Sequence, residues 1–228
     1  MKAQHISLFA TVLVLSTAAC SGTKPPVGAQ AVSDSNVGQS ELEALYWARQ
    51  DSARMRFTQA DADFMSGMIG HHAQALVMSN LAPSNGANPE IQRLASRIIN
   101  AQKDEIATMQ SWLRTRGQPV PEVHIDGNSL MMHGTGDHAM HMPGMLTAEQ
   151  IEELVQARDG DFDRLFLTYM IQHHKGAVSM VSTLFATDGA GQDEAAFKLA
   201  SDINADQDTE IARMELILGA LTGPSGDR

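Results

Sequence analysis

Apolar residues recur at spacings of three and four in four long stretches of this chain, which is the pattern of an amphipathic α-helix. The stretches cover residues 58–82, 88–117, 160–186 and 193–221. Only a few residues separate the first stretch from the second, and the third from the fourth. Such short connections join helices that run antiparallel. The pattern therefore predicts two α-hairpins, which together can form a four-helix bundle.

Capping signals support these helix starts. Thr58 is followed three residues later by Asp61, which resembles a capping box with Asp in place of Glu. Asn88 and Pro89 suit the N-cap and the first helical position of the second stretch. The segment 147–150, Thr-Ala-Glu-Gln, is a capping box that predicts a further short helix through about residue 157.

The two predicted hairpins carry the same sequence pattern. Met-Ile-Gly-His-His at 68–72 returns as Met-Ile-Gln-His-His at 170–174, and Gln-x-x-Glu-Ile-x-x-Met at 102–109 returns at 207–214. A repeat of this length indicates that one structural unit is built twice. The first copy contributes Asp61, Met68, His71, His72, Met78, Gln102, Glu105 and Met109, and the second contributes Asp163, Met170, His173, His174, Met180, Gln207, Glu210 and Met214.

Folding each hairpin about its loop places these polar residues and methionines along one inward seam. Buried polar groups at this density are costly unless they satisfy one another or a ligand. One interpretation is a core of mutually satisfied polar groups with Met as filler. The other is a metal site, because imidazole and carboxylate suit copper, zinc or iron. In that case the His and the neighbouring Met68, Met78, Met170 and Met180 are ligands, and Gln102, Glu105, Gln207 and Glu210 orient the imidazoles.

The connection between the hairpins, residues 118–146, is rich in Gly and Pro, has no helical period and predicts a flexible segment. Its second half is dense in Met and His. Thioether sulfur selects soft monovalent ions such as Cu(I) and Ag(I). The segment is thus a second candidate metal site, and the alternative is a linker that is merely Met-rich. Its candidate ligands are Met131, Met132, His133, His138, Met140, His141, Met142 and Met145.

The N-terminus carries an export signal. A short basic segment precedes the apolar run 6–16, and Thr-Ala-Ala-Cys at 17–20 resembles a bacterial lipoprotein cleavage box. Cleavage before Cys20 and lipidation of its thiol would attach the protein to a membrane, facing the periplasm or the cell exterior; secretory cleavage after Ala19 without lipid is the alternative. Cys20 is the only cysteine, so soft metal ligands elsewhere must be Met or His.

We divide the chain into a signal peptide (1–19), a lipidated Cys with a flexible tether and weak helix (20–55), the first hairpin (56–117), a Met/His-rich crossover with a short helix (118–159) and the second hairpin (160–222).

Charge and motifs narrow the function classes. The chain of 228 residues has a net charge of −11 and no basic patch, which argues against nucleic acid as a partner. No nucleophile-elbow or phosphate-loop pattern is present. We therefore expect no catalytic site and no organic cofactor.

These motifs resemble the domain-of-unknown-function 305 family. The resemblance covers about residues 55–221 and is carried by the motifs at 61–75, 142–147 and 162–177, together with the two Gln-x-x-Glu-Ile-x-x-Met segments. The family consists of exported bacterial proteins with a ferritin-like four-helix bundle. Some of its members are associated with copper or silver binding and resistance through Met and His, which implies a similar role here.

Three functions follow from these features. The first is an extracytoplasmic Cu(I) or Ag(I) buffer or chaperone that uses Met and His. The second is an envelope-anchored module that binds another protein and whose polar seam is structural. The third is a ferritin-like dinuclear metal oxidase, which requires inward Glu-x-x-His motifs. None of the four paired histidines has a Glu three residues before it, so the oxidase is the least favoured.

Overall fold

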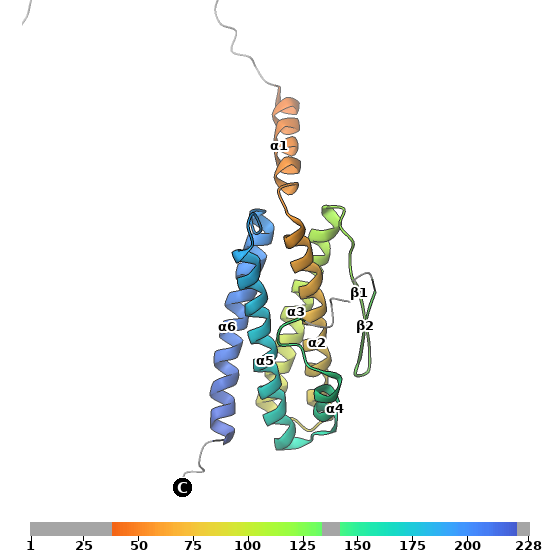
Figure 1. Ribbon diagram of the computed structural model, residues 1–228, viewed down its shortest axis with the longest axis vertical. Coiled ribbons are helices and arrows are strands. Elements are labelled where there is room, and N and C mark those ends of the chain that lie inside the picture. Colours follow the sequence, from red (N-terminus) through yellow and green to blue (C-terminus); the bar gives the residue numbers. More distant parts are fainter. Residues whose placement is uncertain (1–37, 134–141, 223–228) are drawn as a thin grey trace, which may run out of the picture. The chain divides into compact units, whose positions relative to one another are not determined.

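The computed structural model describes residues 38–133 and 142–222, except the side chains of residues 53 and 54. In these segments four long helices lie side by side (Figure 1), which confirms the predicted all-α four-helix bundle. Within the same segments no helix has both the length and the apolarity needed to cross a membrane. The predicted signal peptide, Cys20 and most of the tether lie outside the described residues, as do His138, Met140 and His141.

The first hairpin consists of α2 (Gln59–Ser84) and α3 (Pro89–Thr115). The capping box of α2 forms as predicted. The Thr58 hydroxyl accepts a hydrogen bond from the Asp61 amide, while the Asp61 carboxylate accepts one from the Thr58 amide. Asn88 caps α3 by accepting hydrogen bonds from the second and third amides that follow it. Each cap satisfies donors that the first turn of a helix leaves unpaired.

The second hairpin consists of α5 (Asp159–Ala186) and α6 (Glu194–Thr222). The short helix α4 (Ala148–Gln156) precedes it and begins at the predicted capping box of Thr147. The segment before the bundle also contains a helix, α1 (Gln39–Arg54). All the predicted helices are therefore present, with bounds within a few residues of those expected.

The crossover differs from the flexible segment that the sequence predicted. It contains an antiparallel β-hairpin of β1 (Glu122–Asp126) and β2 (Ser129–His133). The strands are joined through Gly127, whose φ of 57° favours glycine, and Asn128. An Asp-Gly pair between short alternating segments is a turn signal that the Gly-rich and Met-rich composition obscured.

Helix α2 is the central element of the bundle. Every residue from Met68 to Ser79 is buried, because α3, α5 and the β-hairpin all pack against this helix. Helix α6, in contrast, buries only one stripe and leaves residues such as Phe197 and Leu216 exposed. A side chain on the middle of α2 is therefore surrounded by protein whichever way it points.

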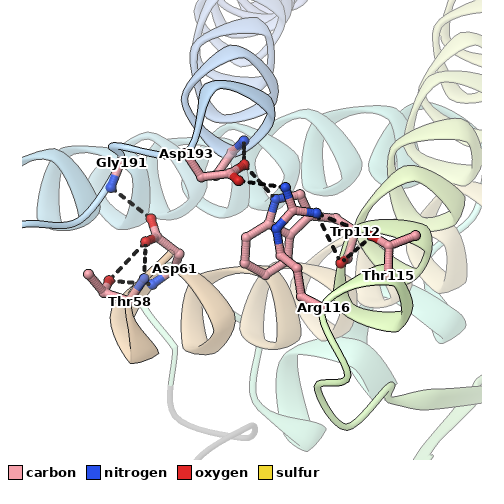
Figure 2. A network of polar contacts seen from close by, with 8 residues as sticks. Thr58, Asp61, Trp112, Thr115, Arg116, Gly191 and Asp193 are labelled. Atoms are coloured by element: carbon pink, nitrogen blue, oxygen red, sulfur yellow. Dashed lines mark hydrogen bonds and ion pairs between the residues drawn. The ribbon is translucent and has the colours of Figure 1, made fainter. Parts of the chain in front are cut away.

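Two aspartates at equivalent positions of the repeats tie the hairpins together. Asp61 at the start of α2 accepts a hydrogen bond of 2.7 Å from the amide of Gly191, in the loop of the other hairpin (Figure 2). Asp163 at the start of α5 accepts bonds from Asn88 in the loop of the first hairpin, 3.1 Å from its amide and 2.6 Å from Nδ2. Each hairpin thus holds the loop of the other at opposite ends of the bundle.

A third aspartate extends this network at the Gly191 end. Asp193 accepts hydrogen bonds from Trp112 Nε1 at 2.9 Å and from the Arg116 guanidinium at 2.5 Å (Figure 2). The guanidinium also lies over the indole, 4.3 Å from its centroid. Burial raises the pKa of Asp193, but the hydrogen bonds from Trp112, Arg116 and the Ala196 amide, together with the positive charge of Arg116, outweigh it and lower the pKa below its usual value. The C-terminal end of α3 is thereby fixed to the start of α6.

The end of the crossover is clamped between α2 and α5. The side chain of Gln74 donates to the carbonyl of Leu146 at 3.0 Å and accepts from its amide at 2.8 Å. On the opposite side, a methyl group on Gly176 would lie 2.0 Å from the carbonyl oxygen of Pro143 and 2.7 Å from Cα of Gly144. Only glycine at position 176 lets the two backbones approach this closely.

We predict that Asp61→Asn destabilises the protein by about 2 kcal/mol, because an amide cannot accept all the hydrogen bonds that converge on this buried carboxylate. The control is Asp63→Asn, an exposed residue on the same turn, which should change stability by less than about 0.5 kcal/mol. Urea unfolding measures both. Equal midpoints for the two variants would contradict the role assigned to Asp61.

Candidate metal centre

Four imidazoles meet at the contact between α2 and α5. His71 and His72 on α2 and His173 and His174 on α5 all have 0% exposure. The rings of His71 and His173 lie 3.9 Å apart between centroids, with an interplanar angle of 38°. The two copies of the repeated motif are therefore in direct contact inside the bundle.

The outer histidine of each pair is oriented by a glutamate from the other helix of its hairpin. His72 Nε2 lies 2.6 Å from Glu105 Oε2, and His174 Nε2 lies 2.8 Å from Glu210 Oε2. A carboxylate accepts hydrogen bonds, so Nε2 carries the proton in each ring. In the neutral ring Nδ1 then holds a lone pair, and the Nδ1 atoms of His72 and His174 are buried with no hydrogen-bond partner.

The inner histidines are also left with unpaired nitrogens. His71 Nε2 donates to the carbonyl oxygen of Pro143 at 3.0 Å, so Nδ1 of His71 is the unprotonated nitrogen, and it has no partner. Both ring nitrogens of His173 lack partners. The side chains of Gln102 and Gln207 are buried and contain unpaired polar atoms as well. Such a concentration of unpaired polar atoms in one core is costly and calls for a ligand or water.

Burial keeps the inner imidazoles neutral. Desolvation, with the nearby His72 as a smaller contribution, lowers the pKa of His71 to about 3, although the hydrogen bond to Pro143 opposes this. Desolvation and then His71 lower the pKa of His173 well below its usual value. Neutral imidazole is the form that binds a metal, so these rings are available as ligands at neutral pH without losing a proton.

The predicted methionines fall into three environments. Those of the inward seam are fully buried: Met68, Met78, Met109, Met170 and Met214. Three others, Met132 from β2, Met142 from the crossover and Met180 from α5, are partly buried and lie over two glycines of α2, Gly67 and Gly70. Met131 and His133 are exposed on β2, and Met145 is partly buried against the groove beside α4. Asp61 and Asp163 hold loops instead of reaching the histidines.

Among residues 38–133 and 142–222, no group of three or more His, Cys, Asp or Glu side chains is arranged to hold a metal ion. This absence concerns those four residue types and not sites in which methionine sulfur is a ligand. Carboxylates gather near the outer histidines and repel one another. Burial, followed by the negative charges of Glu105 and Glu210, raises the pKa of Asp206. Glu105, Glu210 and Asp206 therefore form an acidic group beside the outer histidines, which favours cations.

Two contributions to the site were not predicted from the sequence. The carbonyl of Pro143 sets the tautomer of His71, and a backbone carbonyl leaves no trace in a residue pattern. Gly67 and Gly70 make room for the three methionines. Glycine inside a helical pattern indicates close packing, and the sequence contains this signal at both positions.

We predict that stability falls as the pH drops from about 6.5 to 5. In the unfolded chain His71 and His173 take up protons near pH 6.5, whereas the folded chain with lowered pKa values does not. The unfolded state then binds more protons, and each histidine costs up to about 1.4 kcal/mol per pH unit. Urea unfolding of wild type and of His71→Gln/His173→Gln should show a steeper pH dependence for wild type. The exposed control His124→Gln should behave as wild type, and parallel curves for all three proteins would refute the prediction.

Comparison with known proteins places this arrangement in a family. Residues 61–218 match the family described as "Domain of unknown function (DUF305)". A DUF305 protein of Streptomyces coelicolor, described as secreted, is 25% identical with a TM-score of 0.60 over 74% of this chain and 98% of its own. A DUF305 fragment from Deinococcus radiodurans is 29% identical with a TM-score of 0.59 over 72% and 98% of the two chains.

CopM is a further solved relative. Its Cu(I)-bound form is 29% identical with a TM-score of 0.53 over 72% of this chain and 98% of its own, and CopM has also been solved in Cu(II)-bound, Ag-bound and apo forms. Among curated proteins, "Uncharacterized protein L153" of Acanthamoeba polyphaga mimivirus is 39% identical over 56 residues, which is 25% of this chain and 37% of that protein's length. The family match spans most of the chain, and the bundle is shared with the solved members: the chain belongs to the DUF305 family.

Proposed function

We propose that this protein binds Cu(I) or Ag(I) in the core of its bundle and serves as a buffer or chaperone in copper handling. The observation that carries the proposal is the set of buried imidazoles with unpaired Nδ1 atoms at His71, His72 and His174. Glu105, Glu210 and the Pro143 carbonyl hold these rings through Nε2. This is the arrangement by which an outer hydrogen bond orients a metal-binding histidine.

The donor set fits a soft or borderline cation. Imidazole binds copper, and Met68 and Met170 lie one turn before the His pairs, so thioether sulfur is available near them. Neutral imidazole and thioether leave the positive charge of Cu(I) largely uncompensated. Glu105 and Glu210 supply negative charge, because each is hydrogen-bonded to one of the outer histidines. The CopM relatives, solved with Cu(I), Cu(II) and Ag, support the same choice of metal.

The proposed setting is outside the cytoplasm. The apolar run and the Cys20 box at the N-terminus favour export and lipid attachment, and a solved relative is described as secreted. A protein there that holds monovalent copper without turnover would store the ion or pass it to another envelope protein. We propose the metal ion as its principal partner.

Competitive Cu(I) titration tests the proposal. We predict that His72→Gln/His174→Gln loses Cu(I) equivalents, because each substitution removes an unpaired Nδ1 atom from the core. The matched control is His124→Gln/His133→Gln, the same change at two exposed histidines of the β-hairpin, which should retain the wild-type stoichiometry.

A thermal melt provides the second readout. A ligand bound to the native state raises the melting temperature, so Cu(I) should stabilise wild type and the control more than the core variant. Equivalents lost only in the control would move the site to the crossover. No Cu(I) binding in any of the three proteins would refute the proposed function and favour a protein-interaction module.

A further inference from the structure

Three methionines from separate elements pack against α2 at two of its glycines, Gly67 and Gly70. A methyl group placed on Gly70 would lie 2.6 Å from both Sδ and Cε of Met132, and 3.5 Å from Cε of Met142. A methyl group placed on Gly67 would lie 3.1 Å from Sδ of Met142 and 3.5 Å from Cε of Met180. The thioethers thus occupy the space that the missing side chains of Gly67 and Gly70 leave, with Met142 between the other two. We call Met132, Met142 and Met180 the thioether cluster.

The chemistry of this cluster is selective. Thioether sulfur is a soft neutral donor that prefers Cu(I) and Ag(I) to harder ions. It needs no deprotonation to bind. All three residues are partly buried, so the cluster is neither enclosed in the core nor fully open to solvent. A buried methionine that only fills space, such as Met65, has no such access.

The thioether cluster adjoins the histidines along the chain and in space. Gly70, against which Met132 packs, directly precedes His71. Met142 directly precedes Pro143, whose carbonyl oxygen accepts the hydrogen bond from His71 Nε2. The clamp of Gln74 on Leu146 and the close approach of Gly176 to Pro143 hold Met142 in this place. The cluster therefore adjoins the crossover backbone that contacts the His71 ring.

We propose that Met132, Met142 and Met180 form a second site for a soft monovalent cation, from which the cation passes to the buried histidines. The geometry of the three thioethers supports the site itself. The transfer of the cation to the histidines rests on the function proposed above. A partly exposed thioether site can take an ion from solution or from another protein, whereas four fully buried imidazoles cannot meet a donor directly.

The first test uses the full chain, Ag(I) as the probe, and the ¹³C signals of the methionine methyl groups. In wild type, Ag(I) should shift the methyl signals of the three cluster residues. The variant Met132→Leu/Met142→Leu/Met180→Leu conserves volume and should lose one Ag(I) equivalent while the core equivalents remain. The control Met55→Leu/Met65→Leu removes thioethers at one exposed and one fully buried position outside the cluster, neither of them a candidate ligand, and should lose none.

A second variant blocks the cluster without removing any sulfur. The methyl group of Gly70→Ala would clash with the flexible end of Met132 and make only ordinary van der Waals contact with Cε of Met142, so the Met132 side chain should move out and the fold should persist. We expect the same lost equivalent as in the triple variant, and slower filling of the core in stopped-flow titration. The control Gly219→Ala adds a methyl group to α6 where no atom lies within 4 Å, and it should behave as wild type.

The outcomes separate this proposal from the proposed function. An unchanged Ag(I) stoichiometry and unshifted cluster methyl signals, with the core still binding, would overturn the second site alone. A lost equivalent with core filling at the wild-type rate would keep the site and overturn the transfer. A cluster that binds Ag(I) while His72→Gln/His174→Gln binds as much as wild type would support the thioether site and overturn the core site.

Discussion

The structure depends on placing four imidazoles in the interior of a helical bundle, the inner two of them in neutral form. Burial holds His71 and His173 neutral, with the pKa of His71 lowered to about 3. The remaining hydrogen-bonding needs of the rings are met only in part, by Glu105, Glu210 and one backbone carbonyl. The partial pairing leaves lone pairs directed into a core, and a core of this kind is stable only if the surrounding fold holds it firmly or a ligand completes it.

The surrounding fold supplies that firmness through contacts that repeat in both halves. Asp61 and Asp163 each tie the loop of the opposite hairpin, so the two hairpins cannot slide past one another without breaking buried hydrogen bonds. The rings of His71 and His173, tilted by 38° to one another, lie at the contact of α2 and α5, between these two hydrogen-bonded ends. Equivalent residues of the two repeats thus make the histidine contact at the centre of the bundle and the aspartate contacts at its two ends.

The repeat is broken where the crossover packs. Position 70 is glycine in the first copy and Gln172 in the second, while position 74 is Gln74 in the first and Gly176 in the second. Gly70 admits thioethers, and Gly176 admits the backbone of Pro143. The crossover therefore lies against both helices but presents different groups to each, and its described residues accept a hydrogen bond from the ring of His71 and none from that of His173. These differences between the two copies make the face of the bundle that contacts the crossover asymmetric.

The sequence by itself determined the helices, their caps and the duplication, because these depend on local periodicity and on residues a few positions apart. It also singled out the histidines, the glutamates and the methionines as one seam. Only the tertiary structure decided which nitrogen of each ring is unpaired, since the acceptors come from other helices and from the Pro143 carbonyl. It likewise decided that Met132, Met142 and Met180 meet, because that contact joins residues distant in the chain across two glycines whose missing side chains no pattern of polarity reveals.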